Sequence, residues 1–168
     1  MNDIFKEQII KRNPTSKDSL KKIGIVLAIL VLNMAIMITP VGNFVFVTLG
    51  LSIFAAYHIM GFFNVEYEYV LTNGELDIDI IYNKARRKRL FSTQLGKVEV
   101  FAHYENANFT GQFNSAQDTK DFTSGNRGGN TYAFLIQLKT RKTQVLIEPD
   151  EKMLKALSGA IPRSKFHI

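Results

Sequence analysis

The most extended pattern in the chain is a run without Asp, Glu, Lys or Arg over residues 23–65. Almost every position in it is aliphatic, aromatic or glycine, and the run is interrupted once, around Pro40, a residue that breaks helices. The two pieces, residues 23–39 and 44–63, each approach the ~20 residues that cross a ~30 Å hydrocarbon core as a helix. The pattern predicts a two-helix transmembrane hairpin joined by a tight, uncharged turn.

The basic residues predict the orientation of this hairpin. Every Lys and Arg lies before residue 23 or after residue 83, and the expected loop between the helices has none. Because Lys and Arg are enriched on the cytoplasmic side, we expect a multi-pass protein of the plasma membrane with both termini in the cytoplasm. The absence of cysteine agrees with a reducing compartment. A cleaved signal peptide is the competing interpretation, but a long polar leader precedes the first apolar segment and a second apolar segment follows it at once.

Residues 1–22 form the expected cytoplasmic N-terminal arm, which is mixed in charge. Lys21 and Lys22 stand at the edge of the first apolar segment, as topology anchors do. We expect a solvated arm. The alternative is a short amphipathic turn on the inner leaflet, formed by Ile4, Phe5, Ile9 and Ile10.

Residues 64–168 form the expected cytoplasmic domain, and it opens with a β-hairpin. Apolar side chains alternate with polar ones from residue 65, and Asn73-Gly74 is a strong two-residue turn signal. With that turn every cross-strand pair on one face is apolar, which fixes the register. The pairs are Leu71 with Leu76, Tyr69 with Ile78, Tyr67 with Ile80, and Val65 with Tyr82.

The opposite face of the hairpin is acidic. The same register places Glu68 opposite Asp79, with Glu66 and Asp77 nearby, and like charges in such positions destabilise a sheet. A basic run begins after the next turn and is the first candidate partner for these acids. It consists of Lys84, Arg86, Arg87, Lys88 and Arg89.

Two functional interpretations compete with mutual neutralisation. The four acids Glu66, Glu68, Asp77 and Asp79 offer the oxygen ligands that hard divalent cations take, so a metal site is one alternative. The basic run is the other, because an anionic leaflet attracts basic segments held near it by ~1 kcal/mol per residue. The second interpretation predicts lipid binding by Lys84 and residues 86–89.

The rest of the domain reads as further strands and one closing helix. Alternating patterns recur at residues 97–105, 132–138 and around 145–147, separated by a polar segment at residues 106–130. A helix over residues 149–159 starts at a proline and ends at a glycine. The sequence predicts an α+β membrane protein in which the helical hairpin precedes six or seven antiparallel strands and a C-terminal helix.

This order of elements resembles the bacterial pleckstrin-homology-like (PH-like) domains found beside paired membrane spans in small two-span protein families of Firmicutes. The resemblance lies in the hairpin Glu66–Ile78, the basic strand Arg86–Leu90 and the closing Ile147–Asp150, and it covers residues 64 to about 160. It implies a PH-like antiparallel barrel or sandwich capped by the C-terminal helix. The polar segment at residues 106–130 departs from the pattern.

No arrangement of catalytic residues is apparent in the sequence. The chain has no cysteine, and its three histidines, His58, His103 and His167, lie in the second apolar segment, on a strand and near the end of the chain. Motifs for a serine nucleophile, a zinc site or a phosphate-binding loop are absent. We therefore expect no enzyme activity and no cofactor.

Polar residues inside the apolar segments form a further set of candidates. His58 lies close to the expected cytoplasmic end and is interpreted as a neutral histidine bonded to a neighbour or reaching toward headgroups. Helix rise places Asn33 at a depth between Thr48 and Ser52, so we expect a hydrogen bond across the hairpin. Self-association through these residues is the alternative.

The expected function is that of a membrane-tethered binding or scaffolding module. Its expected partners are membrane lipids, a protein partner or further copies of the chain, and the alternative is a metal- or ligand-responsive regulator that uses the acidic face. Nucleic acid is not expected, because residues 64–168 have fifteen Lys and Arg against twelve Asp and Glu without a broad basic footprint.

Overall fold

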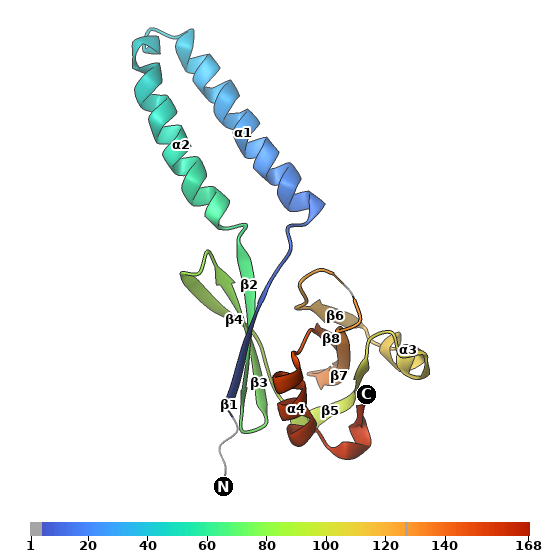
Figure 1. The fold of residues 1–168 in the computed structure, drawn as a ribbon. Helices are drawn as coiled ribbons and strands as arrows, with labels where there is room; N and C mark the ends of the chain where they lie inside the picture. The colour runs from blue at the N-terminus through green and yellow to red at the C-terminus, as the bar shows by residue number, and fades with distance from the viewer. Residues whose placement is uncertain (1–4, 127) are drawn as a thin grey trace. The chain divides into compact units, whose positions relative to one another are not determined.

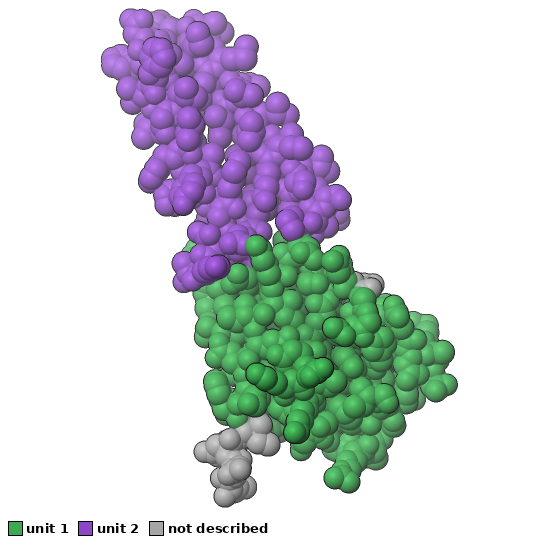
Figure 2. All heavy atoms as spheres, viewed as in Figure 1, with its two compact units in different colours: residues 1–13, 66–81, 86–168 green, residues 14–65, 82–85 purple. Residues whose placement is uncertain are grey.

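The computed structural model describes residues 5–126 and 128–168, and its internal contacts divide the chain into two compact units, coloured separately in Figure 2. The helical unit comprises residues 14–65 and 82–85, and the β unit comprises residues 1–13, 66–81 and 86–168. The helical unit is thus inserted into the β unit near the start of the chain.

The helical unit is an antiparallel hairpin in which α1 (Ser16–Met37) and α2 (Val45–Gly61) flank the short 3₁₀ helix η1 (Gly42–Phe44), as Figure 1 shows. The apolar pattern starts at residue 23, but α1 begins earlier, at Ser16. Its polar first turn is stabilised by an N-terminal cap. The Asp18 carboxylate accepts a hydrogen bond from the Thr15 N–H at 3.0 Å, in a capping box.

The helical segments Ser16–Met37 and Gly42–Gly61 are long and apolar enough to cross a membrane, and only 6% of the most apolar stretch of each is buried. A core helix of a water-soluble protein would be mostly buried, whereas most of the surface of these two segments is left uncovered by the described residues. The turn between them is tight. The backbone of Gly42 approaches Met37 so closely that an added Cβ atom would lie 2.6 Å from the Met37 carbonyl oxygen. Glycine is required there.

The first sheet has the strand order β1-β2-β3-β4. Strand β1 (Phe5–Lys11) comes from the N-terminal segment and pairs antiparallel with β2 (Val65–Thr72), with Phe5 opposite Thr72 and Lys11 opposite Glu66. The expectation of a solvated arm over residues 1–22, and the alternative of an amphipathic turn, were therefore wrong for residues 5–11. Ile4 lies outside the described residues.

The predicted hairpin is present. Strand β2 is joined to β3 (Glu75–Tyr82) by Asn73 and Gly74, both with positive φ, 48° and 86°, as a type I′ turn requires. The predicted apolar face, from Val65 to Leu71 on β2 and from Leu76 to Ile80 on β3, is buried in the core. Strand β4 (Arg86–Gln94) follows on the other side of β3.

The second sheet has the order β6-β8-β7-β5-β9. Its strands are β5 (Val98–His103), β6 (Asp118–Asp121), β7 (Tyr132–Leu138), β8 (Arg141–Ile147) and β9 (Phe166–His167). The strands β5, β7 and β8 pair antiparallel, but β6 with β8 and β9 with β5 are parallel pairs. The expectation of an antiparallel barrel or sandwich is therefore corrected in two respects: two strand pairs are parallel, and within the described residues the two sheets do not close into a barrel.

The polar segment at residues 106–130 contains a helix that its composition did not predict. This helix, α3 (Ala107–Phe113), is capped by the Asn106 side chain, which accepts from the Asn108 N–H. Phe113 packs with Val100 and Leu135 on one face of the second sheet. Burial of Phe113, and of Phe122 further along, gives the otherwise polar segment its place in the fold.

The closing helix is α4 (Glu151–Ala160), which begins two residues later than predicted because Asp150, not Pro149, caps it. The Asp150 carboxylate accepts from the Met153 N–H at 2.7 Å, and Met153 and Leu157 are buried. A cluster of aromatic rings fills the core between the sheets, where Phe91 contacts both Phe122 and Phe134.

Candidate functional site

The acidic face of the first sheet is neutralised by arginines of β4. The Arg87 guanidinium lies 2.6 Å from the Glu68 carboxylate, and Arg89 lies 2.9 Å from Asp77 and 3.2 Å from Asp79. The structure therefore brings the predicted acidic and basic strands together, as mutual neutralisation requires.

The alternation of side chains between the two faces of the sheet shifts by one residue partway along β4. Arg87 and Arg89 face the acids, whereas Phe91 and Thr93, which share their odd parity, are buried in the core. Ser92 instead bonds the acidic face, donating to Glu75 at 2.9 Å. Such a slip is characteristic of a β-bulge. It explains why the sequence alone could not predict on which side of the sheet each basic side chain lies.

The five predicted lipid-binding residues fall into two groups, because successive side chains of β4 point to opposite faces of the sheet. Arg87 and Arg89 are engaged with carboxylates. Lys84, Arg86 and Lys88 are exposed, and the side chain of none of the three makes a hydrogen bond or ion pair within the part of the chain that the structure describes. These three cations are available to a ligand without breaking a contact of the fold.

Glu68 is the most buried of the acids, with a fully covered side chain. Burial, and then a hydrogen bond with the Glu7 side chain of β1, raises its pKa above the ordinary 4.5, although the charge of Arg87 opposes this rise. The arginine is therefore needed to hold an ionised carboxylate at a position that disfavours one.

The proposed metal ligands do not form a metal site. Glu68, Asp77 and Asp79 face guanidinium groups, and among the described residues no group of three or more His, Asp or Glu side chains is arranged to hold a metal ion. Glu66 lies opposite Lys11 of β1. The arrangement favours charge neutralisation over cation binding.

The turn between β3 and β4 belongs to the helical unit. Asn83 and Lys84 both have positive φ, 50° and 56°, and the Asn83 N–H donates to the Asn64 carbonyl oxygen at 2.8 Å. A Cβ atom on Gly61, the last residue of α2, would lie 2.9 Å from the Asn83 side chain. Sequence reasoning missed this contact, for which the only signal was an asparagine directly after a strand.

Three of the four polar residues predicted within the apolar segments form one cluster. Asn33 donates to the Ser52 hydroxyl at 3.2 Å and accepts from the Thr48 hydroxyl at 3.1 Å, while its amide also bonds the Ile29 carbonyl oxygen. His58 lies apart from this cluster, with its ring 4.6 Å from that of Phe54. The cluster joins α1 to α2, and His58 packs within α2.

The other two histidines make contacts within the β unit. His103 Nε2 lies 2.7 Å from the Gly129 carbonyl oxygen, and the His167 ring stacks on Phe109 at 4.5 Å. Both contacts join segments that are distant in the sequence, so these two histidines have a structural role.

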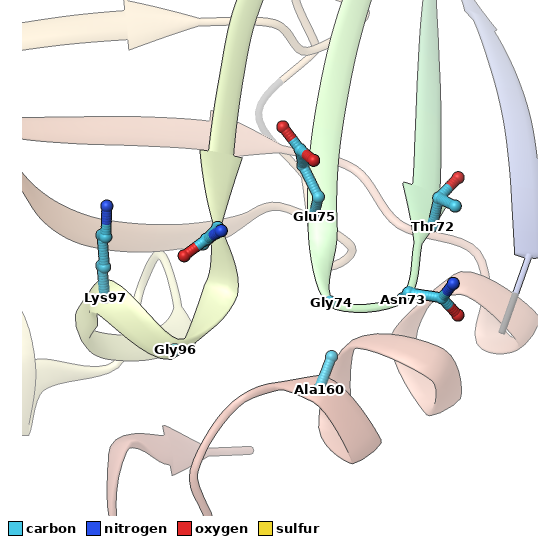
Figure 3. Close-up of a pocket in the computed structure, with 8 residues that line it drawn as sticks. Thr72, Asn73, Gly74, Glu75, Gly96, Lys97 and Ala160 are labelled. Carbon is cyan, nitrogen blue, oxygen red and sulfur yellow. The ribbon is translucent and has the colours of Figure 1, made fainter. Parts of the chain in front are cut away.

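An open hollow of about 620 Å³ lies where the Asn73-Gly74 turn, the 3₁₀ helix η2 (Leu95–Lys97) and Ala160 of α4 meet, as Figure 3 shows. The side chains of Lys97 and Glu75 stand apart from one another in it, and Glu75 already accepts from Ser92. Three segments distant in sequence form this hollow, so no local pattern predicted it. Its side chains do not converge on a common ligand position.

A two-sheet β domain with a closing C-terminal helix defines the class of the fold as PH-like. The chain belongs to the family described as Bacterial PH-like domain (DUF6106), whose model matches residues 2–167. The match includes β1 and the helical hairpin as well as the β unit. Searches of curated proteins and of solved structures found no match. PH-like domains are typically binding modules without enzymatic activity, and this class agrees with the expected function in its coarse form.

Proposed function

We propose that this protein is a binding module anchored in the plasma membrane by α1 and α2, with the β unit in the cytoplasm. The length of the two helices, their apolar composition and their exposure support the anchoring, because such surfaces are stable only when lipid or another apolar partner covers them. The uncharged turn at residues 38–44 supports the orientation.

The proposed ligand is the anionic headgroup surface of the inner leaflet, contacted by Arg86 and Lys88. The observation that carries this proposal is that both side chains are exposed and uncommitted within the described part of the chain, while the neighbouring Arg87 and Arg89 are held by acids. A second copy of the chain or an acidic protein partner is the outcome to consider if lipid is not bound.

The orientation is tested with single cysteines, for which the natural chain is a cysteine-free background. Val41→Cys, in the turn between α1 and α2, is expected to react with a membrane-impermeant maleimide added to intact cells. Lys152→Cys, exposed on α4, is expected to react only after lysis. The opposite labelling pattern, or protection of both cysteines before lysis, would contradict the proposed topology.

Lipid binding is tested on the full-length protein in detergent, titrated with phosphatidylglycerol or phosphatidylcholine and followed by native mass spectrometry. The double variant Arg86→Gln, Lys88→Gln is expected to weaken phosphatidylglycerol binding by about 30-fold, from ~1 kcal/mol per basic residue. High salt should reduce the effect.

The matched control is Lys152→Gln, Lys155→Gln, which removes two exposed charges from α4 and should leave binding unchanged. Equal affinity of the unmodified protein for the two lipids would overturn the headgroup proposal and direct attention to a protein partner.

A further inference from the structure

We infer that the β3–β4 turn holds the Lys84 ammonium at the cytoplasmic boundary of the membrane, where it binds the phosphate of an anionic phospholipid together with Lys22. This inference rests on the proposed membrane anchoring and names the residues that make the first contact. It places Lys84, which lies in the turn before β4, at a specific depth relative to the membrane surface.

The depth of the boundary follows from contacts within the helical unit. Asn33 bonds both Thr48 and Ser52, so these residues share one depth in the antiparallel pair. Because both helices rise at the same rate, Lys22 lies at about the depth of Gly61, where the apolar sequence ends. The Lys22 Nζ atom lies 5.7 Å from the centre of the Phe63 ring, which agrees with this alignment.

The turn that contains Lys84 is fixed at this same depth. Asn83 donates its backbone N–H to Asn64 and packs its side chain against Gly61, at the end of α2. The adjacent Lys84 is exposed and has no partner among the described residues. If the helices span the bilayer, the turn therefore reaches the headgroup layer.

The backbone of Lys84 gives a second, independent observation. Its φ of 56° lies in the left-handed region, where glycine is the favoured residue and a lysine costs free energy. The equivalent position of the preceding turn is Gly74. Local strain of this kind occurs at functional sites, and in this turn it falls on an exposed cation next to Asn83, which contacts the end of α2.

The chemistry of the site suits a phosphodiester. Lys84 and Lys22 each offer an ammonium group, which binds phosphate as a compact charge with several donors. Lys21 is exposed one residue away and adds to the local positive potential. An ammonium group held at the bilayer surface gains most from a ligand that is itself confined to that surface.

The test uses full-length protein in detergent and compares Lys84→Gln, Lys84→Arg and Lys84→Gly in the phosphatidylglycerol titration. The Gln and Gly variants are expected to weaken binding about fivefold, and the Arg variant is expected to retain it. Lys84→Gly should at the same time raise the midpoint of thermal unfolding, because it relieves the positive φ.

Lys139→Gly is the matched control. Lys139 also has a positive φ, 54°, in the β7–β8 turn of the β unit, so its replacement relieves the same kind of strain. It should stabilise the protein without changing lipid affinity. Retention of full affinity by Lys84→Gly would overturn the inference, because Lys84 would then have no ligand role.

The outcomes separate this inference from the proposed function. Loss of affinity in Arg86→Gln, Lys88→Gln but not in Lys84→Gln would overturn the role of Lys84 and leave the headgroup function in place. Equal affinity for the two lipids would overturn both. An arm with inorganic phosphate alone should show no dependence on Lys84, and equal dependence there would overturn the assignment to a membrane phospholipid.

Discussion

Removing residues 2–13 is expected to lower the free energy of unfolding of the β unit by about 5 kcal/mol. The deletion removes β1, whose seven residues pair with β2 along its length, and a net contribution of ~1 kcal/mol per hydrogen bond makes the loss comparable to the whole stability of a small domain. Hydrogen exchange of the β2 backbone in the full-length protein and in the deletion variant measures the effect. A synthetic peptide of residues 1–13 should restore protection.

A graded control separates strand pairing from side-chain bonds. Gln8 donates to the Glu148 carbonyl oxygen at 2.8 Å and accepts from the Asp150 N–H at 2.9 Å, so it links β1 to the start of α4. Gln8→Ala removes both bonds but leaves the strand, and it should cost about 1–2 kcal/mol. Unchanged exchange of β2 after the deletion would show that β1 does not contribute to the stability of the sheet.

The position of β1 changes how the chain is divided. Both segments that leave the helical unit continue into neighbouring strands of one sheet, because β1 precedes α1 and β2 follows α2. A fragment that starts at residue 64 therefore lacks an edge strand of its own domain. The family model, which begins at residue 2, treats strand, helices and β unit as one whole.

The sequence predicted those features whose causes are local. The helical hairpin follows from two apolar segments, and the β2–β3 hairpin follows from alternation around Asn73-Gly74, where a type I′ turn needs two residues with positive φ. The contact of Asn33 with Thr48 and Ser52 follows from helix rise alone. In each case the neighbouring residues and the backbone geometry suffice.

The features that were missed depend on distant partners. Strand β1 carries charges at three of seven positions and pairs with a strand that lies beyond both helices, so no local pattern marks it. The slip within β4 follows from the need to place Phe91 in the core while Arg87 and Arg89 reach acids on the other face. Because the slip comes after Arg89, the buried positions Phe91 and Thr93 do not reveal which basic residues face the acids.

Replacing Arg87 with glutamine is expected to lower the free energy of unfolding by about 3 kcal/mol at pH 8. The variant leaves the Glu68 carboxylate buried without its cation, and breaking a buried ion pair costs ~3–5 kcal/mol. The lower figure applies because the Arg87 side chain is 56% exposed, so water screens part of the interaction. Urea unfolding followed by far-ultraviolet circular dichroism measures the loss.

The loss should depend on pH in a direction set by Glu68. Its pKa is already raised in the folded protein, by burial and then by Glu7, so its contribution to stability is greatest below the ordinary pKa of 4.5 and falls as the pH rises through the folded value. Without Arg87 the folded pKa rises further. The gap between Arg87→Gln and the unmodified protein should therefore be widest at pH 8 and should close as the pH falls through the raised folded pKa values, because a protonated Glu68 no longer needs the cation.

Two variants make this test specific to the pair. Arg86→Gln removes the adjacent arginine, which is exposed and has no partner among the described residues, and should change stability by less than ~0.5 kcal/mol at any pH. Glu68→Gln combined with Arg87→Gln should abolish the pH-dependent part of the loss, because the buried group no longer titrates. A loss in Arg87→Gln that stays constant from pH 8 to pH 5 would mean that packing of the arginine stem, not its charge, supports the acidic face.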